Sequence, residues 1–226
     1  MSDTEVEAAI DTPEPLYHFT GTIQLPWIAD AGEIRFGTAG RCEFEGRPGL
    51  GLVWATDNPN GAYSASAFGC TREYNGRGAY KDGKIWAVRF TLDRAGFQQW
   101  PKAVADDPTW TEDVIKRFNA TSQGDNPRDW WTCKGAVERC NWLAIHVRSY
   151  ASPWTEISLD LPVHTTTHPK NKCPVKSVSF SGRVFQSWLI TDDPSAPQGG
   201  APPSQPTRYG WYVLKEQRPG EWVVCD

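Results

Sequence analysis

A histidine inside a short apolar stretch is the first place in this sequence where side chains could do chemistry. His18 lies within residues 16–20, Leu-Tyr-His-Phe-Thr, whose apolar and aromatic residues predict a strand. Each nitrogen of a neutral imidazole needs its own hydrogen-bond partner, one as donor and the other as acceptor. Two interpretations follow, a histidine that is hydrogen-bonded within the strand and a histidine that binds a ligand.

A second candidate is the glycine-rich basic segment 64–83, which contains Arg72, Arg77 and Lys81. Glycine exposes backbone N–H groups, and arginine donates two parallel hydrogen bonds to phosphate oxygens. The segment is therefore either a solvated loop or a mobile cover over a phosphate-bearing ligand.

Metal chemistry is not predicted. His164 and His168 have the i, i+4 spacing of a helical metal pair, but they lie in a β-branched, proline-bounded stretch where helical spacing is not expected. The six cysteines contain no C-x-x-C pair, so neither a zinc site nor a redox motif is indicated, and free thiols in a reducing compartment are expected.

Composition narrows the classes of protein further. A chain of 226 residues with 39% hydrophobic content can form one domain with an extension. The net charge of -4 argues against binding duplex DNA through phosphate contacts alone, although it would hide a local basic groove. Twelve tryptophans indicate rigid aromatic packing and candidate stacking surfaces. The acidic N-terminus has no apolar signal region and no run approaches the roughly 20 apolar residues of a membrane span, so we expect a cytoplasmic protein without membrane contact.

Apolar patterns and turn signals predict mainly strands. They are expected at residues 16–20, 52–56, 84–92, 142–148, 154–159, 175–191, 209–214 and 220–224. In the clearest of them, residues 84–92, Arg89 is expected to point away from Phe90.

Two helices are predicted. Ile23, Trp27 and Ile28 fall at helical spacing before Gly32, which suits a helix C-terminus. Thr109 and Glu112 have the spacing of a capping box at the start of a second, amphipathic helix.

These elements suggest three parts: an acidic leader at 1–15, a domain at 16–163 and a β-rich extension at 164–226 that includes a Pro/Gly/Ser-rich linker at 192–206.

Two stretches resemble ADP-ribosyltransferases of the DarT-like type. The Tyr-His-Phe-Thr strand is followed at residues 25–34 by a Leu-Pro-x-Ile-x-x-x-Gly-Glu-Ile pattern, and strand 52–56 is followed by Asp-Asn-Pro. The resemblance covers residues 16–60 well and residues 84–160 by order of elements. It implies an α+β fold with a split mixed β-sheet whose cleft holds NAD. The implied reaction breaks the nicotinamide–ribose bond and transfers ADP-ribose to an acceptor.

The resemblance also implies roles for individual residues. His18 donates to the hydroxyls of the adenosine-side ribose, Thr20 and its strand backbone hold the nicotinamide amide, and Tyr17 or Trp54 offers a flat face to the pyridinium. The full set expected to bind NAD is Tyr17, His18, Phe19, Thr20, Trp54, Thr56, Arg72 and Arg77.

Catalysis requires a carboxylate, because the ribose becomes oxocarbenium-like as nicotinamide leaves. Glu138, ahead of strand 142–148, is the first candidate, with Asp129 and Glu156 behind it, and His18 completes the expected catalytic set. The family's Arg-Ala-Glu-like segment is missing, and Arg128-Asp129-Trp130 stands roughly in its place.

The acceptor stays open among DNA bases, RNA, protein side chains and small molecules. Two other classes also remain. One is a non-catalytic module that stacks the bases of single-stranded nucleic acid, and the other is a protein-binding factor such as a phage-encoded inhibitor of a host enzyme. NAD turnover distinguishes the enzyme from both.

Overall fold

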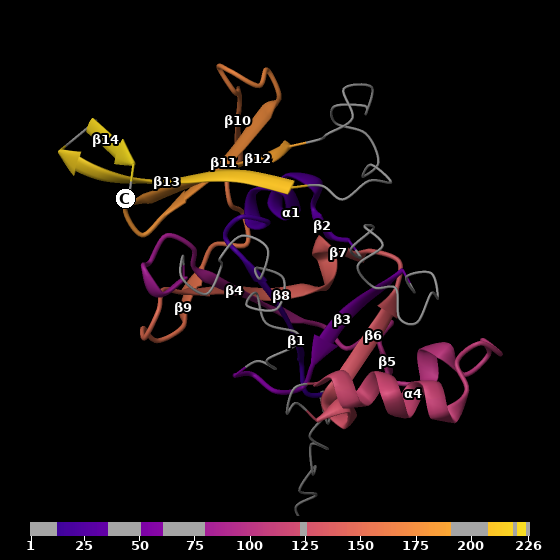
Figure 1. Ribbon diagram of the computed structural model, residues 1–226. Coiled ribbons are helices and arrows are strands. Elements are labelled where there is room, and N and C mark those ends of the chain that lie inside the picture. The colour runs from indigo at the N-terminus through magenta and orange to yellow at the C-terminus, as the bar shows by residue number, and fades with distance from the viewer. Residues whose placement is uncertain are drawn as a thin grey trace, which may run out of the picture.

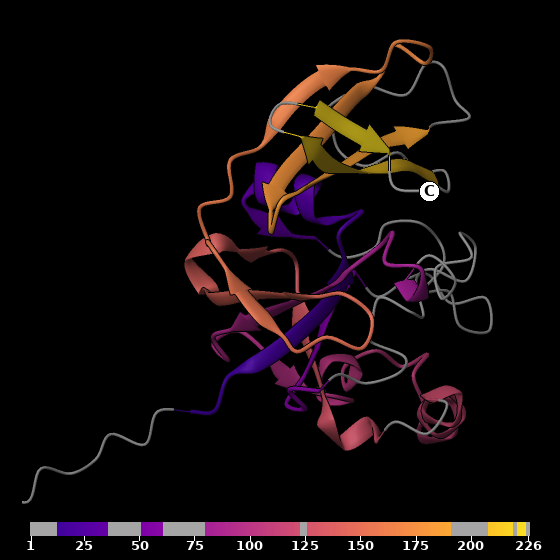
Figure 2. The same ribbon diagram turned by 90° about the vertical axis from the view of Figure 1, so that its left-hand side faces the viewer.

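The computed structural model describes residues 13–35, 51–60, 80–122, 126–190, 208–218 and 221–224, without the side chains at 189–190, 208–213, 216–218 and 222–223. Two antiparallel sheets lie one above the other, with the short helix α1 (Leu25–Ala31) between them (Figures 1 and 2). The expected α+β class is confirmed, and every pair of described strands is antiparallel.

The larger sheet is built around the first strand. Its spatial order is β5 (Gln98–Gln99), β6 (Trp130–Lys134), β3 (Leu52–Thr56), β1 (Leu16–Gly21), β4 (Ala87–Leu92), β8 (Trp142–Arg148) and β9 (Thr155–Ile157). Because side chains alternate along a strand, His18 shares one face with Leu16 and with its cross-strand neighbour Phe90. That face carries the main core, in which Leu16 and Phe90 are fully buried.

The second sheet contains the predicted β-rich extension. Its order is β10 (His164–Thr167), β11 (Pro174–Phe180), β12 (Arg183–Ile190), β13 (Arg208–Arg218) and β14 (Glu221–Val224). The predicted single strand 175–191 is thus two strands, because Ser181 and Gly182 adopt positive φ and form a turn. Val178 and Phe185 join the main core, so the two sheets share one hydrophobic interior.

Helix α1 connects the sheets through a buried hydroxyl. Trp27 Nε1 donates to Ser187 Oγ at 2.9 Å, and Ser187 Oγ donates to the carbonyl oxygen of Ile23 at 2.7 Å. As predicted, α1 ends at Gly32, which has φ of 67° and donates its N–H to the carbonyl oxygen of Ile28.

The other face of the large sheet carries an aromatic cluster at its β3–β6 end. Helix α4 (Glu112–Asn119) places Phe118 against Trp54, Trp100 and Trp130. The predicted capping box is wrong, because Thr111 is the N-cap. Thr109 is instead held by Asp107, whose carboxylate accepts hydrogen bonds from the Thr109 hydroxyl and backbone N–H.

The remaining elements are short. A two-stranded ladder joins β2 (Glu33–Ile34) to β7 (Val137–Glu138). The 3-10 helices are η2 (Lys102–Val104), η3 (Ala120–Ser122), η4 (Pro127–Asp129) and η5 (Arg139–Asn141). Within the described ranges, no helix has the length and apolar character that crossing a membrane requires.

Candidate functional site

Backbone pairing between β1 and β3 is limited to one residue pair. β1 pairs with β4 at all six of its residues, but with β3 only where Tyr17 lies opposite Thr56. His18, the next residue of β1, crosses to β3 with its side chain, since its Nδ1 lies 2.8 Å from the carbonyl oxygen of Trp54. A side-chain hydrogen bond thus joins the two strands at the point where ladder pairing ends.

This contact determines the tautomer of His18. A carbonyl oxygen can only accept, so Nδ1 carries the hydrogen and Nε2 of the neutral ring is an acceptor. Burial lowers the pKa of His18 below its ordinary value of 6.5, and the hydrogen bond to Trp54 opposes that shift. Within the described part of the chain, no partner contacts Nε2. The expected hydrogen bond to a ribose hydroxyl therefore has the opposite direction, with the hydroxyl donating and Nε2 accepting.

The other residues of the predicted NAD-binding strand divide between two faces of the sheet. Thr20 shares the face of His18, whereas Tyr17 and Phe19 point to the opposite face. Phe19 is buried against Trp154, with 6.0 Å between ring centroids. Tyr17 lies under the guanidinium of Arg89, whose Cζ is 5.3 Å from the ring centroid. The predicted set therefore does not converge on one pocket.

On β3, the two predicted contact residues have structural partners. Trp54 packs on Trp100 and Phe118 at centroid distances of 5.1 and 5.8 Å, so its ring belongs to the aromatic cluster. Thr56 is fully buried, and its hydroxyl accepts the backbone N–H of Asn58 at 3.1 Å. Their contacts with nicotinamide stay predictions. Arg72 and Arg77 lie outside the described residues, as does the predicted cover except for residues 80–83.

The three candidate carboxylates lie in three different places. Asp129 ends η4 and accepts a hydrogen bond from Asn126 Nδ2 at 3.0 Å. Glu156, on β9, lies opposite His146 and its carboxylate is 3.8 Å from His146 Nε2, on the face away from His18. Glu138 is exposed on β7, opposite Glu33.

Glu138 is the candidate whose neighbours pack against the sheet face that carries His18. Beside it, the carbonyl oxygen of Val137 accepts a hydrogen bond from Trp142 Nε1 at 3.3 Å. The Trp142 ring packs on Phe90, and Phe90 in turn packs on His18 at a centroid distance of 6.3 Å. A continuous set of buried contacts therefore connects the base of Glu138 with His18.

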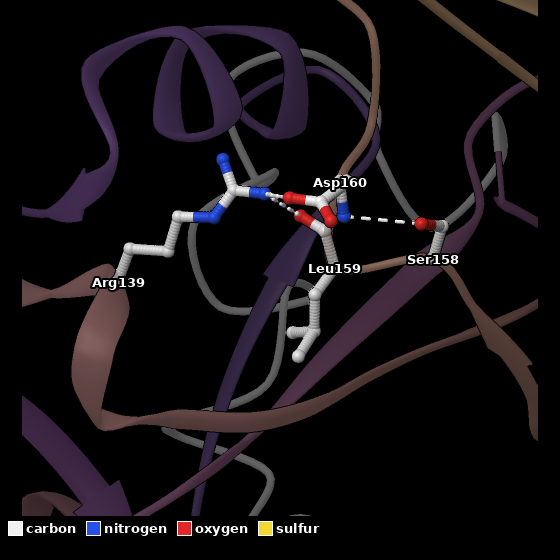
Figure 3. A network of polar contacts seen from close by, with 4 residues as sticks. All are labelled: Arg139, Ser158, Leu159 and Asp160. Carbon is white, nitrogen blue, oxygen red and sulfur yellow. Dashed lines mark hydrogen bonds and ion pairs between the residues drawn. The ribbon is translucent and has the colours of Figure 1, made fainter.

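The residue after Glu138 anchors this segment. Arg139 donates its backbone N–H to the carbonyl oxygen of Gly32 at 2.9 Å, which fixes it to the end of α1. Its guanidinium donates to the carbonyl oxygen of Leu159 at 2.6 Å and forms an ion pair with Asp160 (Figure 3). The backbone N–H of Asp160 donates to the Ser158 hydroxyl at 3.0 Å (Figure 3). The segment 158–160, which accepts the hydrogen bonds of Arg139, is therefore itself held in place. Glu138 therefore projects from a fixed backbone.

Sequence reasoning missed a basic and aromatic group on the opposite face of the sheet. It consists of Arg89, His146, Arg148 and Trp154, which meet through the pairing of β4 with β8 and the turn before β9. The i, i+2 spacing of His146 and Arg148 places both on one face of their strand, and this signal was available in the sequence.

Comparisons of this chain with protein-family models, with curated proteins and with solved structures found no match.

Proposed function

We propose that this chain is an NAD-dependent ADP-ribosyltransferase that transfers ADP-ribose to a macromolecular acceptor, with nucleic acid among the candidates. The observation that carries the proposal is the single-pair ladder between β1 and β3, which the His18 side chain bridges through its hydrogen bond to the carbonyl oxygen of Trp54. This short ladder supports the split sheet that the resemblance implies, and a neutral imidazole lies where the pairing ends.

The chemistry of that imidazole suits a sugar better than an anion. An unprotonated Nε2 accepts a hydrogen bond, and the hydroxyls of a ribose are donors. A neutral ring also adds no positive charge to a cleft in which the nicotinamide ribose becomes cationic as its bond to nicotinamide breaks. His18 would thus orient NAD without opposing the charge that develops.

A carboxylate must stabilise that charge, and Glu138 fits best. It extends from the layer on the His18 face, whereas Glu156 lies on the other face with His146. In the proposed reaction the C1′–N bond of the nicotinamide ribose breaks and nicotinamide leaves with the bonding electron pair. An acceptor nucleophile then forms a new bond to C1′ and loses a proton. Glu138 would lie against the ribose hydroxyls while C1′ carries positive charge.

The alternative of a base-stacking module has less support. None of the tryptophan side chains that the structure describes is fully exposed, and several form the aromatic cluster on α4. Stacking of successive bases requires open aromatic faces.

The test is incubation of the wild-type protein with NAD labelled in the adenylate moiety and a panel of single-stranded DNA, RNA and protein acceptors. We expect free nicotinamide and a labelled acceptor. If the protein binds NAD but releases no nicotinamide and labels no acceptor, the transferase assignment is wrong and a binding role replaces it.

A further inference from the structure

On the face of the large sheet that points away from the main core, four buried nitrogen atoms lack a hydrogen-bond partner in the part of the chain that the structure describes. Arg89 on β4 lies directly across from His146 on β8, and Arg148 shares the face of His146 because it follows two residues later. Trp154 contacts both guanidinium groups, with 4.8 Å from Arg89 Cζ and 4.4 Å from Arg148 Cζ to its ring centroid. Buried polar atoms without a partner are rare in folded proteins, and an absent ligand is one of the physical explanations. The four atoms are Nε of Arg89, Nδ1 of His146, Nε of Arg148 and Nε1 of Trp154.

The positive charge of this group is uncompensated. No carboxylate among the described residues forms an ion pair with Arg89 or Arg148. Glu156, on the same face, lies 3.8 Å from His146 Nε2 and its side chain is 70% exposed. Burial and then the charge of Arg89 lower the pKa of His146, so its ring adds no charge at neutral pH. Arg89 Nη1 donates to the carbonyl oxygen of Pro59 at 2.7 Å, which holds one guanidinium in place. The group therefore suits a ligand that brings carboxylates, which pair with guanidinium forks.

The start of β1 brings the chain's own acidic segment to this group. The cross-strand neighbour of Arg89 is Phe19, but its Cζ lies 5.3 Å from the ring centroid of Tyr17, so the side chain extends toward the first residues of the strand. Arg94 Nε donates to the carbonyl oxygen of Glu14 at 2.8 Å, which fixes the chain just before β1. Residues 1–12 therefore join the described structure beside the Arg89 guanidinium.

The acidic segment 1–12 has the charge and the reach to bind both arginines. An extended chain spans at most about 3.3–3.6 Å per residue. Asp11 can thus lie about 10 Å from Glu14, and Glu7 up to about 23 Å. Arg148 is two strand positions beyond Arg89, roughly 7 Å further along the sheet, so both guanidiniums are within range. Because the segment is tethered, its effective concentration is on the order of millimolar, and a weak contact is enough for it to bind. The segment contains no lysine or arginine, and its carboxylates are Asp3, Glu5, Glu7 and Asp11.

We propose that the acidic segment 1–12 binds Arg89 and Arg148 as an intramolecular ligand. Asp11 and Glu7 are the carboxylates that we assign to this contact, since they are the two nearest to β1 within the segment. Any other anion must displace the segment before it can reach this face of the sheet, so the contact is autoinhibitory. Salt screens ion pairs at a partly exposed surface, and the contact should therefore weaken as ionic strength rises. The proposal does not depend on the transferase assignment.

The first test measures how fast a glutamate-specific protease releases the peptide 1–7 from the full-length protein, with mass spectrometry as the readout. A bound Glu7 is protected, so R89Q/R148Q should release the peptide about fivefold or more faster than wild type at low salt. High salt should remove most of the difference, because the ion pairs are screened. R128Q/R183Q is the matched control. It also removes two positive charges, on η4 and β12, and should release the peptide at the wild-type rate.

The second test leaves both arginines in place, so it stays valid if R89Q/R148Q does not fold. Nitrogen–proton correlation spectra resolve the arginine Nε–Hε groups, and R89Q and R148Q assign the two signals. E7Q/D11N should shift both signals and speed exchange of their Hε with water by about tenfold, since it removes the charged acceptors. D3N/E5Q, the matched control within the same segment, should change them less.

Unchanged Nε–Hε signals in E7Q/D11N would show that the proposal is wrong, as would equal peptide release by R89Q/R148Q and R128Q/R183Q. Protection of Glu7 that rises with protein concentration would also contradict it, because the segment of a second copy would then be the ligand. Neither test contains NAD, so failure of the transferase assignment would leave both results unchanged.

Discussion

His18 Nδ1 donates a hydrogen bond to the carbonyl oxygen of Trp54, 2.8 Å away and on the strand from which β1 has just separated. One imidazole therefore has two separable roles. Its Nδ1 holds β3, and its Nε2 is the acceptor that we assign to a ribose hydroxyl.

Replacing His18 by asparagine should separate the two roles. The asparagine amide can donate to Trp54 from near the Nδ1 position, but it has no counterpart of Nε2. We expect H18N to bind NAD several-fold to tenfold more weakly, because a neutral hydrogen bond contributes about 0.5–1.5 kcal/mol. H18A should show the same loss of affinity by calorimetry and, in addition, a free energy of unfolding lower by about 1–3 kcal/mol. NAD affinity equal to wild type in H18N would show that Nε2 does not contact the ligand.

The pKa of His18 predicts how stability depends on pH. Because burial lowers that pKa in the folded protein, the unfolded chain takes up a proton near pH 6.5 before the folded protein does. The free energy of unfolding should therefore fall as pH falls below 6.5, until the folded-state pKa is reached. Urea unfolding at pH 7.5 and 5.5 measures this change. Between these two pH values, H18N should lose less stability than wild type. Part of the pH dependence remains in both proteins, because burial also lowers the pKa of His146. An equal loss in both proteins would contradict the assignment to His18.

E138Q should reduce nicotinamide release by about 10²–10³-fold, since it removes the negative charge beside the oxocarbenium-like ribose. Its NAD affinity should remain within a factor of about two to three of wild type, because the charge acts mainly in the transition state. The fold should not weaken, because Glu138 lies opposite Glu33 and the substitution removes a like-charge pair. D129N and E156Q are the matched controls. If D129N or E156Q loses turnover while E138Q keeps full activity, the catalytic carboxylate is the one changed in that variant, and the proposed reaction stays the same.

Arg139 should act as a positioning residue for Glu138. R139Q removes the ion pair with Asp160 and the hydrogen bond to Leu159, so β7 is less firmly held. We expect kcat to fall while KM for NAD changes little, with a smaller effect for D160N because the Asp160 side chain is 92% exposed. Steady-state kinetics of the two variants, with thermal unfolding of each, measures this. Equal changes in kcat and KM would indicate a general loosening of the fold instead.

Local patterns predicted much of the fold. Strand 52–56 has the observed bounds of β3, and Gly32 ends α1 as expected from its freedom to adopt positive φ. The start of α4 was misplaced because Asp107, outside the four-residue pattern, holds the Thr109 hydroxyl.

His18 and Glu138 of the candidate site were named from the sequence, whereas the contacts that hold them were not. His18 stands out in the sequence because a polar side chain interrupts an apolar strand. Its partner, the backbone carbonyl of Trp54, has no sequence signature. Likewise Arg89 meets Arg148 and Trp154 through the register of β4 with β8, which pairing and not local periodicity determines.

Replacing Ser187 by alanine tests whether the two sheets unfold as one cooperative unit. Its buried hydroxyl accepts from Trp27 Nε1 and donates to the carbonyl oxygen of Ile23, so it joins β12 to the start of α1. S187A leaves a donor and an acceptor without partners in a buried junction, and the free energy of unfolding should fall by about 1–3 kcal/mol. The exposed Ser179, changed to alanine, is the control and should have little effect. Because Val178 and Phe185 pack in the core of the large sheet, we expect a single urea transition, with tryptophan fluorescence and far-UV circular dichroism coinciding. Two separate transitions in S187A but not in S179A would show that this junction, more than the shared core, holds the sheets together.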